Sequence, residues 1–96
     1  MYNIVLSRNA SRTLEKATPT ARRRIITALE RLRSKPYSGK TLRGELEGLF
    51  SLRIGGVRAV YEVDAEKKVV VVLAIGPGAT SIRSNRLAFW DIITHL

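Results

Sequence analysis

The chain has 96 residues, of which 45% are hydrophobic and 26% charged, and it contains no cysteine. This length is typical of a single domain, here residues 1–96, that can bury one hydrophobic core without cross-links. The lack of cysteine excludes a disulfide framework and any thiolate metal site. The longest apolar run, Val69 to Ile75, has seven residues, too few to span a membrane. No signal peptide is recognisable, so we expect a soluble, cytoplasmic protein.

The distribution of charge is more informative than the composition. The net charge is +9 at pH 7, and all of the excess lies in residues 1–44, which carry eleven Lys and Arg against two acidic residues. Residues 45–96 carry six basic and six acidic residues. A one-sided excess of this kind indicates a polyanionic partner such as nucleic acid, a membrane surface or an acidic protein. The alternative is that the charge only maintains solubility.

The N-terminal half predicts a strand followed by a helical hairpin. Residues 2–6 form a short strand candidate, and Ser7 is a suitable N-cap for a first helix. Thr18 and Pro19 then predict the N-cap and first residue of a second helix, which must end before Pro36. The apolar face of this second helix consists of Ile25, Ala28, Leu29 and Leu32.

Beyond residue 44 the hydrophobic period changes from helical to two. Two alternating strands flank Gly55 and Gly56, and a longer turn leads to a strand over residues 69–75 that is apolar enough to be central and covered on both faces. The spacing of Phe89, Ile92, Ile93 and Leu96 predicts a terminal amphipathic helix. The predicted fold is α+β, with an N-terminal strand and helical hairpin packed on a mainly antiparallel sheet and a C-terminal helix.

The two glycines raise an electrostatic question. If they form a two-residue turn, Arg53 and Arg58 lie directly opposite one another on the face away from the core. Like charges in such positions destabilise a sheet by about 0.2–1 kcal/mol, unless an anion lies between them. Guanidinium groups bind phosphate in a bidentate manner and stabilise charge that develops on a phosphoryl oxygen. The alternative is that Glu62, on the same face, neutralises one arginine in a surface ion-pair network.

Three short motifs stand in order around this predicted hairpin: Leu42-Arg43-Gly44, Phe50-Ser51-Leu52-Arg53 and Arg58-Ala59-Val60-Tyr61. Their order and spacing resemble the RelE/ParE toxin superfamily, in which Leu-(Lys/Arg)-Gly precedes a (Tyr/Phe)-x-(Leu/Ile)-(Arg/Lys) strand, a glycine-containing turn and Arg-x-Val-Tyr. With the helical hairpin included, the likeness covers residues 2–76. It implies a RelE-like fold.

The resemblance also implies a function, namely the toxin of a type II toxin–antitoxin pair. RelE-type members are ribosome-dependent mRNA endoribonucleases that use no metal or cofactor: the RNA 2′-hydroxyl attacks the adjacent phosphate, and Arg and Lys side chains stabilise the transition state. Arg53 and Arg58 match these catalytic positions, and Ser51 stands where some relatives have a further lysine. The implied partners are a cognate antitoxin, the ribosome and mRNA, with a homodimer or a toxin–antitoxin heterotetramer as the assembly. ParE-type members instead inhibit DNA gyrase, and an inactive relative that only binds its antitoxin is a third alternative.

The C-terminal stretch departs from the family pattern. The family's last strand is followed by glycine, a basic residue and then a tyrosine or similar aromatic, but here no basic residue closely follows Gly76 and no tyrosine follows Tyr61. Arg83 and Arg86 are displaced candidates for contact with RNA. The usual general base is therefore missing: either the site is weakened, or the tail has diverged from that of an active ancestor.

Five further residues are candidates for RNA contact. Arg22, Arg23 and Arg24 lie on the outer part of the second helix, where they form either a patch for the RNA backbone or a solvated helix face. Lys40 and Arg43 come just before the sheet, where they are placed to hold RNA near the arginine pair. The parity of Tyr61 places it in the core rather than at the site. No cluster of His, Asp or Glu has the spacing of a metal site, and we expect no metal or cofactor.

Overall fold

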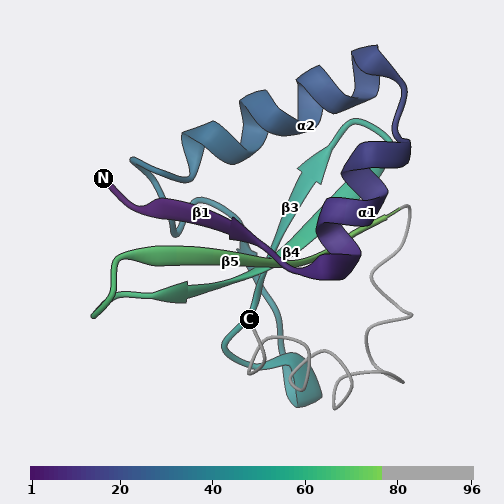
Figure 1. Ribbon diagram of the computed structural model, residues 1–96. Coiled ribbons are helices and arrows are strands. Elements are labelled where there is room, and N and C mark those ends of the chain that lie inside the picture. Colours follow the sequence, from purple (N-terminus) through teal and green to yellow (C-terminus); the bar gives the residue numbers. More distant parts are fainter. Residues whose placement is uncertain (77–96) are drawn as a thin grey trace.

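The computed structural model describes residues 1–76, apart from the side chain of Glu45, and it confirms the α+β architecture. Two helices pack on one face of a five-stranded sheet (Figure 1). The elements are β1 (Asn3–Leu6), α1 (Arg8–Lys16), α2 (Pro19–Arg31), β2 (Lys40–Thr41), the 3-10 turn η1 (Gly44–Leu46), β3 (Phe50–Ile54), β4 (Val57–Asp64) and β5 (Val69–Gly76). Neither described helix is long and apolar enough to cross a membrane. The predicted C-terminal helix, Arg83 and Arg86 lie outside the described residues.

The sheet has the strand order β1-β5-β4-β3-β2. β1 runs parallel to β5, and every other pair of neighbours is antiparallel. The prediction that residues 69–75 form a central strand is confirmed, because β5 lies between β1 and β4 and buries side chains on both of its faces.

Both predicted helix starts are confirmed. The Ser7 hydroxyl accepts a hydrogen bond of 3.1 Å from the backbone N–H of Ala10, and Thr18 accepts one of 3.2 Å from Ala21. Each bond satisfies one of the amide groups that the first turn of a helix leaves without an internal partner. α2 ends at Arg31, several residues before Pro36.

Ser7 also fastens α1 to an irregularity in the sheet. Its hydroxyl donates a 2.7 Å hydrogen bond to the carbonyl of Leu73, and its backbone N–H donates to Val72. Leu73 is the extra residue of a β-bulge, because Val60 pairs with Ala74 while Tyr61 pairs with Val72. The buried Ser7 side chain therefore joins the start of a helix to the one point where the β4–β5 register shifts.

The sheet separates two hydrophobic clusters. The larger lies between the sheet and the helices and contains Ala10, Ile25, Leu29, Leu32, Ile54, Ala59, Tyr61, Val70, Val72 and Ile75. The smaller lies on the opposite face and contains Leu46, Leu49, Val60, Leu73 and Ala74. The bulge places Leu73 and its neighbour Ala74 in the same cluster, whereas strict alternation would send them to opposite faces. The face of the sheet opposite the helices thus has a hydrophobic cluster of its own.

The double role of Ser7 predicts an unequal effect of removing the two N-caps. Ser7→Ala removes a buried cap and the donor to Leu73, and we expect it to lower the free energy of unfolding by about 1–3 kcal/mol. Thr18→Ala removes only an exposed cap and should cost about 0.5–1 kcal/mol. Urea unfolding followed by circular dichroism measures both, and equal losses would contradict the proposed link between α1 and the bulge.

Candidate functional site

The hairpin between β3 and β4 has the predicted two-residue turn. Gly55 has a φ of 60°, a left-handed conformation that glycine adopts without strain, and a positive φ at the first central residue is the pattern of a type II′ turn. The register places Ile54 opposite Val57 and Arg53 opposite Arg58, as expected from the sequence. Because Ile54 lies in the core beneath the helices, the two arginines lie on the other face.

Arg53 and Arg58 are both exposed, and neither guanidinium forms an ion pair or hydrogen bond with a side chain that the structure describes. Among the side chains that the structure describes, the one ion pair joins Arg33 to Glu30 at 3.2 Å, on the far end of α2. Two arginines thus lie directly opposite one another on adjacent strands, and none of the carboxylates that the structure describes is paired with either of them. This arrangement is unfavourable for the isolated fold and favourable for binding an anion.

Glu62 does not supply the missing counter-charge. It lies on the same face as Arg58 but four residues along β4, which corresponds to about 13 Å. The carboxyl is half-buried, and burial is the main cause that raises its pKa, with a smaller contribution from the negative charge of Asp64. A nearby guanidinium would lower this pKa instead. The ion-pair alternative is therefore not what the structure shows.

Lys40 and Ser51 share the surface of the arginine pair. Lys40 is paired directly with Ser51 across the β2–β3 ladder, and Ser51 in turn with Val60 of β4. Directly paired residues point to the same face, and Ser51 lies two residues before Arg53. Ser51 is only 6% exposed, whereas Lys40 is exposed. Lys40, Arg53 and Arg58 consequently line one cationic surface, which we call the arginine face.

A buried phenol sets the position of Lys40. The Oη of Tyr61 accepts a 2.9 Å hydrogen bond from the backbone N–H of Gly39, the residue before Lys40. Tyr61 is fully buried and stacks on Phe50 with ring centroids 5.3 Å apart, which confirms its predicted place in the core. Burial raises the pKa of its hydroxyl, so the group stays a neutral phenol. A Cβ on Gly39 would lie 2.5 Å from that Oη, which explains the glycine at this position.

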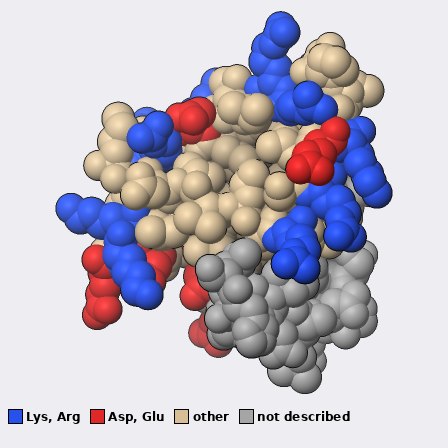
Figure 2. Space-filling view, in the orientation of Figure 1, with Lys and Arg blue, Asp and Glu red and all other residues tan. Residues whose placement is uncertain are grey.

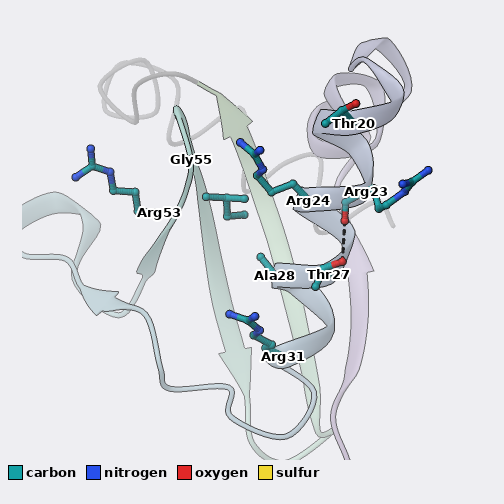
Figure 3. Close-up of a pocket in the computed structure, with 9 residues that line it drawn as sticks. Thr20, Arg23, Arg24, Thr27, Ala28, Arg31, Arg53 and Gly55 are labelled. Carbon is teal, nitrogen blue, oxygen red and sulfur yellow. Dashed lines mark hydrogen bonds between the residues drawn. The ribbon is translucent and has the colours of Figure 1, made fainter.

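The other residues predicted to contact RNA lie apart from the arginine face. Arg43 is exposed and directly precedes η1. Arg23 is exposed on α2 and extends away from the hairpin (Figure 3). Arg22 stabilises the fold itself. Its guanidinium donates hydrogen bonds to the backbone carbonyls at the end of α1, at 3.1 Å to Leu14 and 2.9 Å to Glu15. These bonds satisfy acceptors that the end of a helix leaves free.

Of Arg24 and Arg31, the sequence indicated only Arg24, as part of the patch with Arg22 and Arg23. Both line a groove of about 490 Å³ between α2 and the tip of the hairpin, together with Arg53 and Gly55 (Figure 3). The signal was present in the sequence, because residues seven apart lie on one face of a helix. Lys and Arg side chains also cover more of the surface in view than Asp and Glu do (Figure 2). Within residues 1–76, no three His, Cys, Asp or Glu side chains come together in a way that could hold a metal ion.

Comparison with known proteins now identifies the family. A family model described as "ParE toxin of type II toxin-antitoxin system, parDE" matches residues 4–82. The chain belongs to this toxin family. The toxin RelG of Mycobacterium tuberculosis is 36% identical over 76 residues, which cover 77% of this chain and 87% of RelG.

Solved structures agree with this assignment. The crystal structure of the toxin–antitoxin complex RelBE2 from Mycobacterium tuberculosis contains a chain that matches with a TM-score of 0.72 and 35% identity, over 78% of this chain and 95% of that one. The intact RelBE toxin–antitoxin complex of E. coli matches with a TM-score of 0.71 and 29% identity, over 81% and 98%. The resemblance to the RelE/ParE superfamily and the RelE-like fold are confirmed.

The pairing of Arg53 with Arg58 predicts that removal of either arginine stabilises the fold and weakens anion binding. Arg53→Gln or Arg58→Gln removes the repulsion, so each should raise the free energy of unfolding by about 0.2–1 kcal/mol at low ionic strength. Added inorganic phosphate should raise the melting temperature of the wild type more than that of either variant, because only the wild type retains both guanidinium groups. Thermal unfolding with and without phosphate measures this, and equal phosphate shifts in all three proteins would contradict an anion site between the arginines.

The raised pKa of Glu62 predicts a pH-dependent effect of its own. Because the folded state favours the protonated carboxyl, ionisation of Glu62 opposes folding once the pH rises above the unfolded value of about 4.5. Glu62→Gln should therefore stabilise the protein at pH 7 and have little effect at about pH 3.5, where the carboxyl is protonated in both states. Urea midpoints at the two pH values check this; a variant less stable than wild type at pH 7 would indicate a favourable ion pair instead.

Proposed function

We propose that the protein is a toxin held in check by a cognate antitoxin, and that it acts as a ribosome-dependent endoribonuclease on mRNA. The observation that carries the proposal is the direct pairing of Arg53 with Arg58, with no carboxylate partner among the described side chains. The cytoplasm, where ribosomes and mRNA meet, is the corresponding location. The named complexes of the relatives, RelBE2 and RelBE, support an antitoxin partner for this chain as well.

The arginine face suits in-line attack of a ribose 2′-hydroxyl on the adjacent phosphate. The O2′–P bond forms while the P–O5′ bond breaks, so the products are a cyclic 2′,3′-phosphate and a new 5′-hydroxyl. Negative charge builds on the phosphoryl oxygens in between, and the guanidinium groups of the two facing arginines donate hydrogen bonds to those oxygens from both sides. Lys40 adds a third cation for the flanking backbone.

The proton transfers of this reaction require groups that the arginines do not provide. The 2′-hydroxyl must lose a proton, and the 5′ oxygen must gain one. Tyr61 is not available for either step, because its Oη is bound to Gly39 on the core side of the sheet. The arginine face therefore contributes binding, orientation and charge stabilisation to the reaction.

A second candidate function is inhibition of DNA gyrase. It is favoured by the description of the matching family, which names ParE. In that case the arginine face would serve as a protein-binding surface, and no chemistry would take place on it. The two functions predict different effects of removing one arginine, because only a ribonuclease would then lose RNA cleavage.

We predict that Arg53→Gln and Arg58→Gln each reduce RNA cleavage about 10²–10³-fold, the usual effect of removing one group that stabilises a developing oxyanion. The measurement is primer extension on an mRNA in a translating extract, with new cuts expected at codons in the ribosomal A site. Lys67→Gln is the matched control, because it removes one exposed cation from the β4–β5 turn at a distance from the arginine face. It should cleave as the wild type does.

The opposite result is equally informative. If wild-type protein makes no cuts in an extract that an established RNA-cleaving toxin does process, the ribonuclease proposal fails. A DNA supercoiling assay with purified gyrase then decides between the gyrase inhibitor and a relative that only binds its antitoxin.

A further inference from the structure

A second arginine-rich surface lies on the helix side of the β3–β4 hairpin. Four arginines line the groove between α2 and the hairpin, namely Arg23, Arg24, Arg31 and Arg53, and none of the described residues that line it is acidic. Arg24 and Arg31 extend from α2 toward the hairpin (Figure 3). Arg53 reaches the rim from β3, but its side chain extends to the other side of the strand (Figure 3).

Arg24 and Arg31 differ from the arginines that stabilise the fold. Arg22 donates to carbonyls of α1, and Arg33 pairs with Glu30. Neither Arg24 nor Arg31 has a hydrogen bond or ion pair with any side chain that the structure describes, and both are exposed. The positive charges of Arg24 and Arg31 repel one another across the groove and do not stabilise the fold. The same is true of the paired arginines on the arginine face.

The spacing of these two arginines suits an extended anion. Seven residues of helix separate their Cα atoms by about 10.5 Å along the axis of α2. Arg24 reaches across to the turn, since a Cβ built on Gly55 would lie 3.1 Å from its Nη1. The groove thus presents charge along its length and also at the tip of the hairpin.

The lining favours nucleic acid over an acidic polypeptide. Protein interfaces have an apolar core, but the groove is lined by only two apolar side chains, Ala28 and Ile54, and Ile54 is already buried within the domain at 5% exposure. Contacts to a phosphate backbone need no apolar core and are strongly cationic.

We propose that this groove is a second phosphate-binding site, in which Arg24 and Arg31 hold the backbone of a folded RNA on the side of the hairpin opposite the arginine face. The tip enters between two phosphate-bearing segments, one bound by each face. Gly55 and Gly56 carry no side chains, so the RNA backbone can pass close to the turn. The inference rests on the proposed function in so far as RNA is the ligand, and its test separates binding from cleavage.

The first test measures binding to a 2′-O-methyl RNA hairpin, which lacks the nucleophile and cannot be cleaved. Fluorescence anisotropy across a salt series gives the slope of log affinity against log salt. The double variant Arg24→Gln/Arg31→Gln should lower the magnitude of this slope by about 1.4–1.8, since each phosphate contact contributes about 0.7–0.9. Lys67→Gln/Lys68→Gln removes the same charge from the β4–β5 turn and should leave the slope near that of the wild type.

The second test uses the tip itself. Gly56 has open space around its position for a Cβ and does not have a positive φ, so a side chain fits there without strain. Gly56→Glu places a carboxylate between the two phosphate segments and should weaken RNA binding, whereas Gly56→Gln, of the same size but neutral, should bind more tightly than Gly56→Glu. Unfolding curves for both variants check that the fold is retained.

The outcomes are distinct. A smaller salt slope in the α2 variant Arg24→Gln/Arg31→Gln, with no RNA cleavage by any of the proteins, would support the phosphate site in the groove and refute the ribonuclease proposal. Cleavage in the wild type with an unchanged slope in the α2 variant would refute the groove and support the ribonuclease. If the α2 variant loses affinity for a poly-glutamate peptide but not for the RNA hairpin, the groove binds an acidic polypeptide and the RNA proposal is wrong. Equal binding by Gly56→Glu and Gly56→Gln would refute insertion of the tip.

Discussion

The register of the β3–β4 hairpin is the constraint on which the rest of the molecule depends. A two-residue turn at Gly55 and Gly56 pairs Arg53 with Arg58 and places Ile54 beneath the helices. A shift by one residue would move every side chain of a strand to the opposite face, so the core and the arginine face would be lost together. The same turn therefore determines both the packing of the core and the position of the arginine pair.

Burial on both faces of the sheet makes this register rigid. On the helix side, Tyr61 is fully buried and hydrogen-bonded to Gly39, which holds the backbone next to Lys40. On the other side, a small cluster around Val60 and Leu73 supports the surface that carries the arginines. Apolar contacts on both faces of the sheet thus hold the two arginines opposite one another despite the repulsion between their charges.

Local signals explain why much of the architecture could be predicted. Ser7, Thr18 and Pro19 act within one helical turn, and the hairpin follows from two glycines and the alternation on either side of them. The bulge at Leu73 could not be predicted, because it depends on contact with Ser7, 66 residues away. The capping role of Arg22 and the isolation of Glu62 from Arg58 likewise depend on how separate segments meet.

By itself, the sequence determined the helix starts, the hairpin, the burial of Tyr61 and the pairing of Arg53 with Arg58, since each depends on short-range periodicity and turn chemistry. Only the tertiary structure decided which cations act together. It brought Lys40 beside Ser51, and it placed Arg24 and Arg31 across a groove from Gly55 while it engaged Arg22 with α1. The physical reason is that side chains on different elements meet only after the helices have packed on the sheet, and no local pattern specifies that contact.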